Sequence, residues 1–536
     1  MSRVAAAQFA AGTDAAVNLQ ACLRAVDSAA EAGADLVVLP EFCNHLSWYA
    51  DREHARREAC RIGDDFLTAV SERAAQHGIY VKIGVSLARD DGRTTASSLL
   101  YGPDGALLGE SDKQVLMGAE NDYFDAGEVD SPIIETPIGR LGMYACMEGV
   151  INEVTRSMAV RGAQILLNSL NSFAVDEAGL HVPVRAAENK VWVVAANKVG
   201  PLLPEDKLPG IAAALGVPAD RLYGAGESQI VAPDGTVVAI APPTEEAIVV
   251  AEIDASLADD KTRPDGSDLL AVRRPEIYGP LSEPSARTAP PGADTISAAV
   301  VEPEAELIRT AAQAGAELIV LPELAEITAD QVRAALTGTS AHAVLTVRDD
   351  AAHHGVLVNA EGIVGRQPQL HATRRHPWLT ELGQELLIFE LPWGRLAIVV
   401  GDDAILPETF RLAALADADV VAVPHSPSEP WEYKLGLPER SAENRVNVVS
   451  AGYDANGEFH GACFALSPDF TLWTSWQGPF TGVISHPVVS ETVAGSVSLR
   501  STIRPAQAVN RHVSKGTNLV DGRPRRPLAT ATTGTE

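Results

Sequence analysis

Basic residues are scarce in this sequence. Lysine and arginine together number 42 against 71 aspartates and glutamates, which gives a formal net charge of −29 at pH 7. A surface with this balance repels phosphate backbones and anionic lipids. We therefore expect no nucleic-acid partner.

Long apolar runs are missing as well. No stretch reaches about 18 consecutive apolar residues, the length that a membrane-spanning helix needs. The opening MSRVAAAQFAAGTDAA is followed by no export cleavage pattern. The sequence thus predicts a protein without a membrane span.

Cysteine is rare and irregularly spaced. The five cysteines are Cys22, Cys43, Cys60, Cys146 and Cys463. Their odd number and spacing predict reduced thiols of a cytoplasmic protein rather than a disulfide framework. No CxxC or HExxH motif occurs, and the glycine-rich GAG at 224–226 lacks the rest of a nucleotide-binding loop. We accordingly expect neither a metal nor an organic cofactor.

The sequence does contain an internal repeat. GRLGMYACMEGVINEVTR and GRLAIVVGDDAILPETFR begin at 139 and 394, 255 residues apart, and RAAENKVWVVAANKVG and RSAENRVNVVSAGYDA begin at 185 and 440, again 255 apart. AEAGADLVVLPEF and AQAGAELIVLPEL begin at 30 and 312, which are 282 residues apart, so the first copy is longer between Glu41 and Gly139. A duplication of this size indicates two domains of similar fold.

The repeat sets the expected boundaries of the domains. We predict a first domain over 1–280, a Pro-, Ser- and Ala-rich linker over 281–294, a second domain over 295–514 and a loose polar tail over 515–536. Each copy alternates short β-branched runs with Ala-rich stretches; in the first copy we predict helices at 17–34 and 64–78 and strands at 35–40 and 80–88. This alternation is typical of an α/β domain in which helices cover β-sheets.

Cys146, Glu41 and Lys113 are candidates for catalytic chemistry. Cys146 closes the apolar run RLGMYA and precedes a stretch with helical character, whose amino-terminal dipole would stabilise a thiolate. Glu41 ends the apolar run LVVLP, where a buried carboxylate needs a partner or a function. The alternatives are a structural buried cysteine, a solvated carboxylate after a strand and a surface lysine.

An ordered set of motifs connects these residues. The motifs are LPEF (39–42), a lysine in the GxxxK context of 109–113, ENDYFDAG (120–127), GRLGMYAC (139–146), RAAENKVWVVAAN (185–197), GESQIVAPDGTVV (226–238) and RRPEIYGPL (273–281). In this order they resemble the nitrilase superfamily of carbon–nitrogen hydrolases, over essentially all of residues 1–280. The resemblance implies an α/β fold of two tandem αββα sandwich domains.

The resemblance also implies roles for individual residues. It makes Cys146 the nucleophile, Glu41 the general base, Lys113 the cation beside the developing oxyanion and Glu120 an additional active-site glutamate. The backbone N–H of Met147 would complete the oxyanion site. A thiol that attacks an unactivated amide needs a base for its proton and donors for the negative charge that develops.

Two further residues are implied to line the substrate pocket. Asn171 and Phe173, in NSLNSF, fall where the superfamily forms its pocket, although Asn and Ser there could equally be turn residues. The segments after Lys113 and after Cys146 depart from the superfamily's usual pattern, so the substrate is left open.

The second copy lacks the nucleophile. At the 255-residue shift Cys146 meets Gly401, Lys113 aligns with Gln369, and only Glu41 has a counterpart, Glu323. We expect this copy to be inert in covalent chemistry, the alternative being a diverged active copy that uses Asp402. Because sandwiches of the superfamily pair face to face, we expect an intramolecular pseudo-dimer, with further homo-oligomerisation left open; a regulator bound in the vacant pocket is the competing explanation.

The sequence therefore predicts a cytoplasmic, cofactor-independent hydrolase of a small-molecule substrate. The expected reaction cleaves a linear non-peptide C–N bond of an amide or carbamoyl compound through a cysteine thioester, releasing ammonia or an amine and a carboxylic acid. A nitrilase that converts a nitrile to an acid and ammonia is the first alternative. A catalytically inactive scaffold or binding protein is the second.

Overall fold

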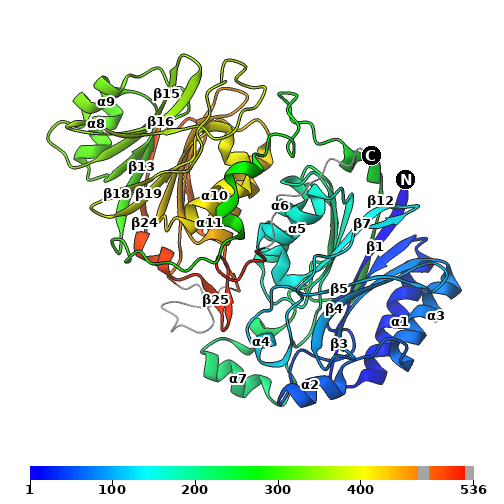
Figure 1. The fold of residues 1–536 in the computed structure, drawn as a ribbon. Helices are drawn as coiled ribbons and strands as arrows, with labels where there is room; N and C mark the ends of the chain where they lie inside the picture. Colours follow the sequence, from blue (N-terminus) through cyan, green and yellow to red (C-terminus); the bar gives the residue numbers. More distant parts are fainter. Residues whose placement is uncertain (469–481, 526–536) are drawn as a thin grey trace.

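The computed structural model describes residues 1–468 and 482–525. Its strands and helices form two similar halves that lie side by side, as Figure 1 shows. Each half has two six-stranded sheets packed face to face, with helices on the outer faces. No helix in the described ranges is long and apolar enough to cross a membrane.

The first half is built from residues 2–253. Its outer sheet has the order β12 (Ala247–Ile253), β1 (Ser2–Gln8), β2 (Leu36–Val38), β3 (Tyr80–Ala88), β4 (Thr94–Tyr101) and β5 (Leu107–Asp112). Its inner sheet has the order β11 (Val237–Ile240), β10 (Gln229–Val231), β9 (Trp192–Ala196), β8 (Ile165–Ser169), β7 (Gly139–Ala145) and β6 (Ile134–Thr136). Residues such as Val38 and Leu167 fill one apolar core between the two sheets.

Helices cover both sheets of this half. α1 (Ala15–Glu31) and α3 (Asp65–His77) lie on the outer sheet, and α5 (Asn152–Val160) and α6 (Val182–Ala187) lie on the inner one (Figure 1). Asp14 and Asp64 begin α1 and α3 by accepting backbone N–H groups of the first turn, which is why these helices start where they do. The shorter helices are α2 (Arg52–Glu58), α4 (Glu120–Tyr123) and α7 (Leu208–Leu215).

The second half repeats this topology. One sheet has the order β24 (Ser498–Ile503), β13 (Ile296–Val301), β14 (Leu318–Val320), β15 (His342–Asp349), β16 (Ala352–Asn359) and β17 (Gly362–Pro368). The other has the order β23 (Val488–Glu491), β22 (Phe459–Ala465), β21 (Asn447–Tyr453), β20 (Val420–Pro424), β19 (Gly394–Ile398) and β18 (Ile388–Leu391). α8 (Ala305–Gln313), α9 (Ala329–Ala335), α10 (Pro407–Leu415) and α11 (Leu437–Asn444) cover the two sheets. The predicted tandem of αββα sandwiches is confirmed.

The two halves meet through α5 and α6 of the first and α10 and α11 of the second (Figure 1). Arg156 donates to Glu408 at 3.0 Å, and Arg411 donates to Glu153 at 2.6 Å. Both ion pairs are buried. Each is the repeat equivalent of the other, because Glu408 and Arg411 lie 255 residues after Glu153 and Arg156. The interface is therefore isologous, like that of a twofold dimer, although a single chain forms it.

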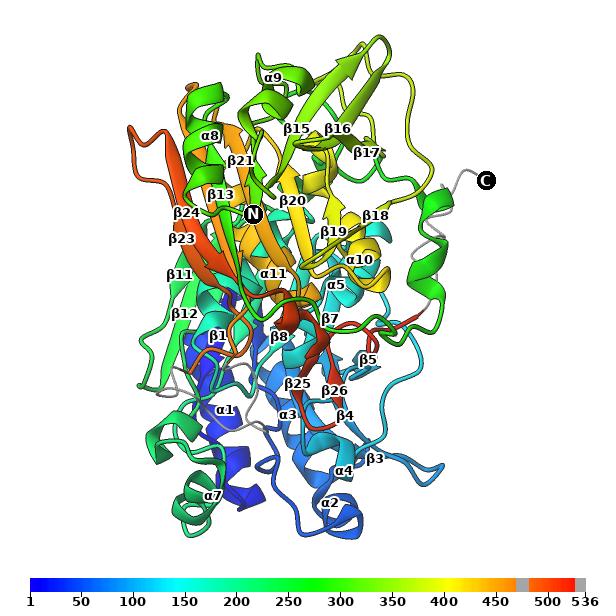
Figure 2. The ribbon, with the colours of Figure 1, turned by 90° about the vertical axis from the view of Figure 1, so that its left-hand side faces the viewer.

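Each half also sends an arm across to the other. The hairpin of β25 (His512–Ser514) and β26 (Thr517–Asn518) reaches the first half beside α4, as Figure 2 shows. There the Thr517 hydroxyl donates to Leu116 O at 2.7 Å and accepts from the Gly118 N–H at 2.9 Å. In the opposite direction, Ser267 Oγ accepts from the Arg374 N–H at 2.7 Å. The two arms make the same kind of contact at equivalent loops.

The predicted linker and tail both have partners. Linker residues Thr288 and Ala289 donate their N–H groups to Asp417 of the second half. The structure differs from the prediction of a loose tail beginning at 515, because Leu519 and Val520 are buried and Thr517 holds the first half. Burial of these two apolar side chains favours the packed position of residues 515–525. Residues 526–536 of the predicted tail lie outside the described residues.

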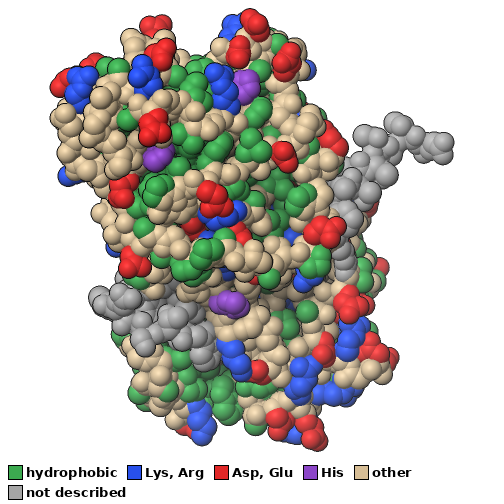
Figure 3. Space-filling view, turned by 60° about the vertical axis from the view of Figure 1, so that its left-hand side comes forward, with side chains coloured by type: hydrophobic (Ala, Val, Ile, Leu, Met, Phe, Trp, Pro, Cys, Tyr) green, Lys and Arg blue, Asp and Glu red, His purple; other side chains and the backbone are tan. Residues whose placement is uncertain are grey.

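Charged side chains of both signs are interspersed on the face drawn in Figure 3. Acidic groups outnumber basic ones in the whole chain, 71 against 42. On the visible face no broad basic area gathers, so this face offers no electrostatic footprint for a phosphate backbone.

Candidate active site

The predicted catalytic residues sit at the ends of strands and in the loops that follow. Glu41 follows β2, Lys113 directly follows β5 and Cys146 directly follows β7, while Glu120 opens α4. Glu41 packs closely against Gly84 of β3, because a Cβ added to this glycine would lie only 2.8 Å from the Glu41 Cα. Only glycine fits at that place, which explains a glycine in the middle of a buried strand.

Lys113 is buried between two carboxylates. Its Nζ donates to Glu41 Oε1 at 2.9 Å and to Glu120 Oε2 and Oε1 at 2.9 and 3.1 Å. Burial alone would lower the pKa of Lys113, but the charges of Glu120 and Glu41 outweigh it and raise the pKa well above its ordinary value. The lysine is therefore a permanent cation of the site.

The two carboxylates differ in their surroundings. Burial raises the pKa of Glu120 to about 7 although Lys113 opposes the shift, and Glu120 Oε2 also accepts the Met117 N–H at 2.8 Å. Glu41 Oε2 is buried and has no hydrogen-bond partner among the described residues. Glu41 thus keeps one free oxygen that can accept a proton, whereas both oxygens of Glu120 are engaged.

Cys146 is held in a left-handed backbone conformation, with φ of +49°. The side chain is buried, and the backbone N–H donates to Asn168 Oδ1 at 3.1 Å. Burial raises the pKa of the Cys146 thiol well above its ordinary value; Lys113 opposes the shift, and the charge of Glu41 adds to it. The thiol is accordingly protonated at rest and needs a base before it can attack.

This corrects the expectation that a helix dipole stabilises a thiolate here. Cys146 opens a short 3-10 turn, Cys146–Gly149, and α5 begins only at Asn152. The dipole of so short a turn is small, so desolvation of the sulfur prevails. Met147 is the second residue of the turn, where a backbone N–H has no acceptor inside the turn.

Glu148 ties the loop of Lys113 to the strand of Cys146. Its carboxylate accepts the Gln114 N–H and the Ala145 N–H, each at 2.8 Å. Burial raises the pKa of Glu148 to about 7, and the two N–H donors oppose this shift. Glu148 joins the segment after Lys113 to the segment before Cys146, so it fixes the position of these two segments relative to one another.

The predicted pocket residues Asn171 and Phe173 have other contacts. Asn171 Nδ2 donates to Ser47 Oγ at 2.9 Å, and Asn171 Oδ1 is buried without a described partner. Phe173 packs against the apolar cluster of α7. A role of either residue in substrate binding stays a prediction.

Two buried lysines near the site were missed from the sequence. Lys82 Nζ contacts Ser169 Oγ, and burial lowers the pKa of Lys82 to about 7. Lys198 Nζ donates to Phe42 O at 3.1 Å, and burial lowers the pKa of Lys198 to about 8. The charge of Glu41 raises the pKa of each of them, so both lie within electrostatic reach of that carboxylate. The sequence signal that could have identified Lys82 is its position inside the otherwise uncharged strand 80–88.

Comparison with known proteins places the first half of the chain in a family. Residues 3–262 match the model of the carbon–nitrogen hydrolase family. The amino-terminal half of the chain belongs to the nitrilase superfamily of carbon–nitrogen hydrolases. The resemblance to carbon–nitrogen hydrolases seen in the motifs of this half is thus confirmed.

Several curated relatives align with the same half. A nitrilase from Pyrococcus abyssi is 28% identical over 262 residues, which cover 49% of this chain and 92% of that protein. An N-carbamoylputrescine amidase from Solanum tuberosum is 26% identical and covers 51% of this chain and 93% of that protein. Among solved structures, an amidase from Nesterenkonia sp. is 24% identical with a TM-score of 0.42, covering 52% of this chain and 95% of that one.

The equivalent position in the second half is filled by Arg375. Its Nη2 donates to Glu323 Oε1 and Oε2 at 2.7 and 2.8 Å, and its Nε donates to Asp402 at 3.0 Å. Gly401 occupies the place that Cys146 has in the first half, and a Cβ there would come 2.5 Å from Glu323 Oε1. A cysteine at 401 would therefore collide with the rearranged carboxylate. The second half thus has no cysteine at this position, and Arg375 fills the space around Glu323.

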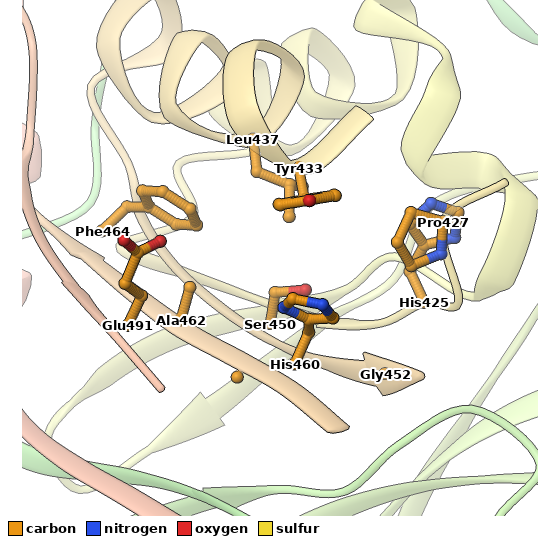
Figure 4. A pocket seen from close by; sticks show the side chains of 11 residues that line it. His425, Pro427, Tyr433, Leu437, Ser450, Gly452, His460, Ala462, Phe464 and Glu491 are labelled. Carbon is orange, nitrogen blue, oxygen red and sulfur yellow. The ribbon is translucent and has the colours of Figure 1, made fainter. Parts of the chain in front are cut away.

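The second half also contains a small cavity between η8 (Glu432–Gly436) and α11 on one side and β21 and β22 on the other, shown in Figure 4. His425, Tyr433, His460 and Glu491 are among its lining residues. Its accessible volume is about 30 Å³.

Proposed function

We propose that the first half hydrolyses a linear, non-peptide amide or carbamoyl compound with Cys146 as nucleophile. The observation that carries the proposal is the buried ammonium of Lys113 between Glu41 and Glu120, within electrostatic reach of the Cys146 thiol. Glu41 Oε2 is buried and unpartnered among the described residues, which leaves this oxygen free to accept the thiol proton.

Acylation begins with removal of the thiol proton. Glu41 takes the proton from Cys146 as the sulfur attacks the carbonyl carbon, and Lys113 and the Met147 N–H face the oxygen on which charge develops. The tetrahedral intermediate then breaks its C–N bond, and Glu41 returns the proton to the leaving nitrogen. Ammonia or an amine departs, and a thioester remains on Cys146.

Deacylation repeats the sequence with water. Glu41 takes a proton from the water that attacks the thioester carbon, the C–S bond breaks, and the proton returns to the Cys146 sulfur. The product is a carboxylic acid. Glu120 keeps Lys113 in position throughout, because both its oxygens accept from the ammonium.

A nitrile is the second candidate substrate, since a relative that is 28% identical over 262 residues carries the name nitrilase. Thiol attack on a nitrile carbon followed by hydration would lead to the same thioester with loss of ammonia. Parallel assays of the amide and the nitrile of the same acid separate the two functions, because both substrates yield the same acid and ammonia and only the substrate consumed differs. An inactive scaffold is disfavoured, because it gives no reason for keeping a lysine and two carboxylates buried beside a strained cysteine.

We further propose that the second half acts as a built-in dimer partner for the first. The reciprocal ion pairs of the interface and the arm at Thr517 support this, since that arm holds the loop from which Glu120 projects. Val513 and Leu519 of the arm pack in one cluster with Met147 and Val150, next to the nucleophile. A second chain would not be needed to complete the site.

The test of the catalytic proposal is ammonia release from a panel of small amides, carbamoyl compounds and nitriles. The intact chain is expected to hydrolyse at least one amide or carbamoyl compound, and Cys146→Ala is expected to lose at least about 10⁴-fold in kcat. The matched control is Cys463→Ala, a buried cysteine of the second half that should leave activity unchanged. Equal activity of Cys146→Ala and the intact chain would refute the role of this cysteine.

A further inference from the structure

Three metal-ligating side chains converge at the repacked centre of the second half. Glu323 follows β14, His353 lies on β16 and His376 lies in the connection from β17 to β18. One ligand atom of each lies within 4.8 Å of those of the other two. His376 Nε2 is already 3.2 Å from Glu323 Oε1. Nothing in the hydrolase chemistry of the first half uses these residues.

The hydrogen bonds of His353 fix which of its nitrogens is free. Gln369 Nε2 donates to His371 O at 2.6 Å, so its amide oxygen is the atom that faces His353. An amide oxygen only accepts, and His353 Nδ1 at 2.7 Å must therefore carry the proton. The lone pair is left on Nε2, which is buried and has no hydrogen-bond partner among the described residues.

This is the arrangement of a histidine prepared to bind a metal. Ligating histidines donate their other ring N–H to a carbonyl or carboxylate, which sets the tautomer and the orientation of the ring. For a histidine without a ligand the same arrangement is unfavourable, because a buried unpaired acceptor loses its hydration. His353 is fully buried, and its Nε2 has no hydrogen-bond partner among the described residues.

The separations suit a small ion. A tetrahedral Zn²⁺ with bonds of about 2.0–2.1 Å places its ligand atoms about 3.4 Å apart. The pair of Glu323 and His376 is already at this separation, at 3.2 Å. The ligand atom of His353 lies within 4.8 Å of the other two, so it has to approach by at most about 1.4 Å.

The charges nearby also admit a cation. Arg375 is shared between Glu323 and Asp402, so these three groups together carry one net negative charge. The next cation, Arg263, is paired with Glu432 at 2.9 Å. Two neutral histidines and a carboxylate in a net negative surrounding favour a divalent transition metal over Mg²⁺ or Ca²⁺, which prefer oxygen ligands alone.

We propose that Glu323, His353 and His376 bind one divalent transition-metal ion, of the Zn²⁺ class, at the place of the lost catalytic centre. The ion would pair with Glu323 Oε1 and His353 Nε2 and would replace the hydrogen bond between Glu323 and His376. The second half would then be a metal-stabilised partner of the hydrolase. This site is independent of the reaction proposed for the first half.

The test is titration of the metal-free full chain with Zn²⁺ by isothermal calorimetry. The chain carries Cys146→Ala so that the thiol of the first half cannot bind the metal. One equivalent is expected to bind, with affinity at least about 100-fold weaker in His353→Ala, and Zn²⁺ is expected to raise the Tm of the parent chain but not of the variant. His512→Ala, at an exposed histidine, is the matched control and should bind as the parent does.

Two further variants keep the proposal falsifiable if His353→Ala fails to fold. His376 is only partly buried, so His376→Ala should fold and also lose at least about 100-fold in affinity. Gln369→Leu removes the group that orients His353 and should weaken binding about 10–100-fold. No Zn²⁺ binding to the parent chain, or equal binding to the parent and to His376→Ala, would overturn the site.

Discussion

At the scale of single residues, the two halves treat one strained position differently. Cys146 and Gly401 have nearly the same φ, +49° and +52°. A residue with a Cβ costs roughly 1–2 kcal/mol in this conformation, and glycine removes the cost. The half that kept the cysteine therefore bears a strain that the other half has lost, which is consistent with a chemical role for the sulfur.

The ordered motifs of the sequence were enough to select Glu41, Lys113 and Glu120, and the structure joins these side chains in one ion-paired cluster. Their electrostatics could not be predicted, because pKa shifts depend on burial and on distances that spacing does not encode. Arg375 could not be predicted either, since it enters the second centre from a segment without motif character. The histidines 353 and 376 are too irregularly spaced from Glu323 to form a recognisable metal motif.

The raised pKa of Glu120 predicts a pH dependence of stability. The pKa is about 7 in the folded chain and near 4.5 in the unfolded one, so the folded state binds more protons between these values and its stability falls as pH rises from 4.5 to 7. Glu120→Gln, a neutral isostere, should lack this contribution. Urea unfolding at pH 5 and pH 7 measures this: the free energy of unfolding of the variant should rise relative to that of the parent chain as the pH goes from 5 to 7. The same difference in free energy between variant and parent at both pH values would contradict the raised pKa of Glu120.

At the scale of elements, regular segments were predictable and short turns were not. The strand predicted at 80–88 is β3 (Tyr80–Ala88), and the helix predicted at 17–34 is α1 (Ala15–Glu31). The helix expected directly after Cys146 begins later, because the 3-10 turn there has the same apolar composition as a helix. The packing of residues 515–525 was missed because the partners of this arm lie in the other half.

The arms allow a matched comparison. Thr517→Val removes two hydrogen bonds to the loop of Glu120 and should lower kcat/KM about tenfold, with a loss of stability of about 1–2 kcal/mol. Ser267→Ala removes the equivalent contact in the second half and should lower stability without changing kcat/KM. Steady-state kinetics and urea unfolding of both variants are the measurements. Unchanged kinetics for Thr517→Val would show that this arm has no part in the active site.

At the scale of the whole molecule, the buried pairs between the halves hold the tandem together. Two buried ion pairs cross the interface, Arg156 with Glu408 and Arg411 with Glu153. Each pair removes two charges from water, and the cost in free energy becomes large when one partner is missing. The repeat made two domains predictable, and similarity to face-to-face sandwiches made their pairing a reasonable hypothesis. The reciprocal pairing of particular side chains became visible only in three dimensions.

This arrangement predicts strong coupling between partners. Arg411→Met should lower the free energy of unfolding by about 3–5 kcal/mol, because it leaves Glu153 buried and unpaired. Adding Glu153→Gln should recover a large part of that loss. Arg309→Met, in an exposed pair with Glu306, is the control and should change stability by less than about 1 kcal/mol. A double-mutant cycle by urea unfolding measures the coupling, and additive losses would mean that the pair contributes nothing at the interface.

The most direct test of the account is to identify the covalent intermediate. The enzyme is mixed with an amide substrate found by the ammonia assay and quenched in acid during turnover, and the chain is digested and examined by mass spectrometry. The account predicts the mass of the acyl group on the peptide that contains Cys146 and its absence in Cys146→Ala. Turnover without an acyl group on that peptide, together with an active Cys146→Ala variant, would contradict it.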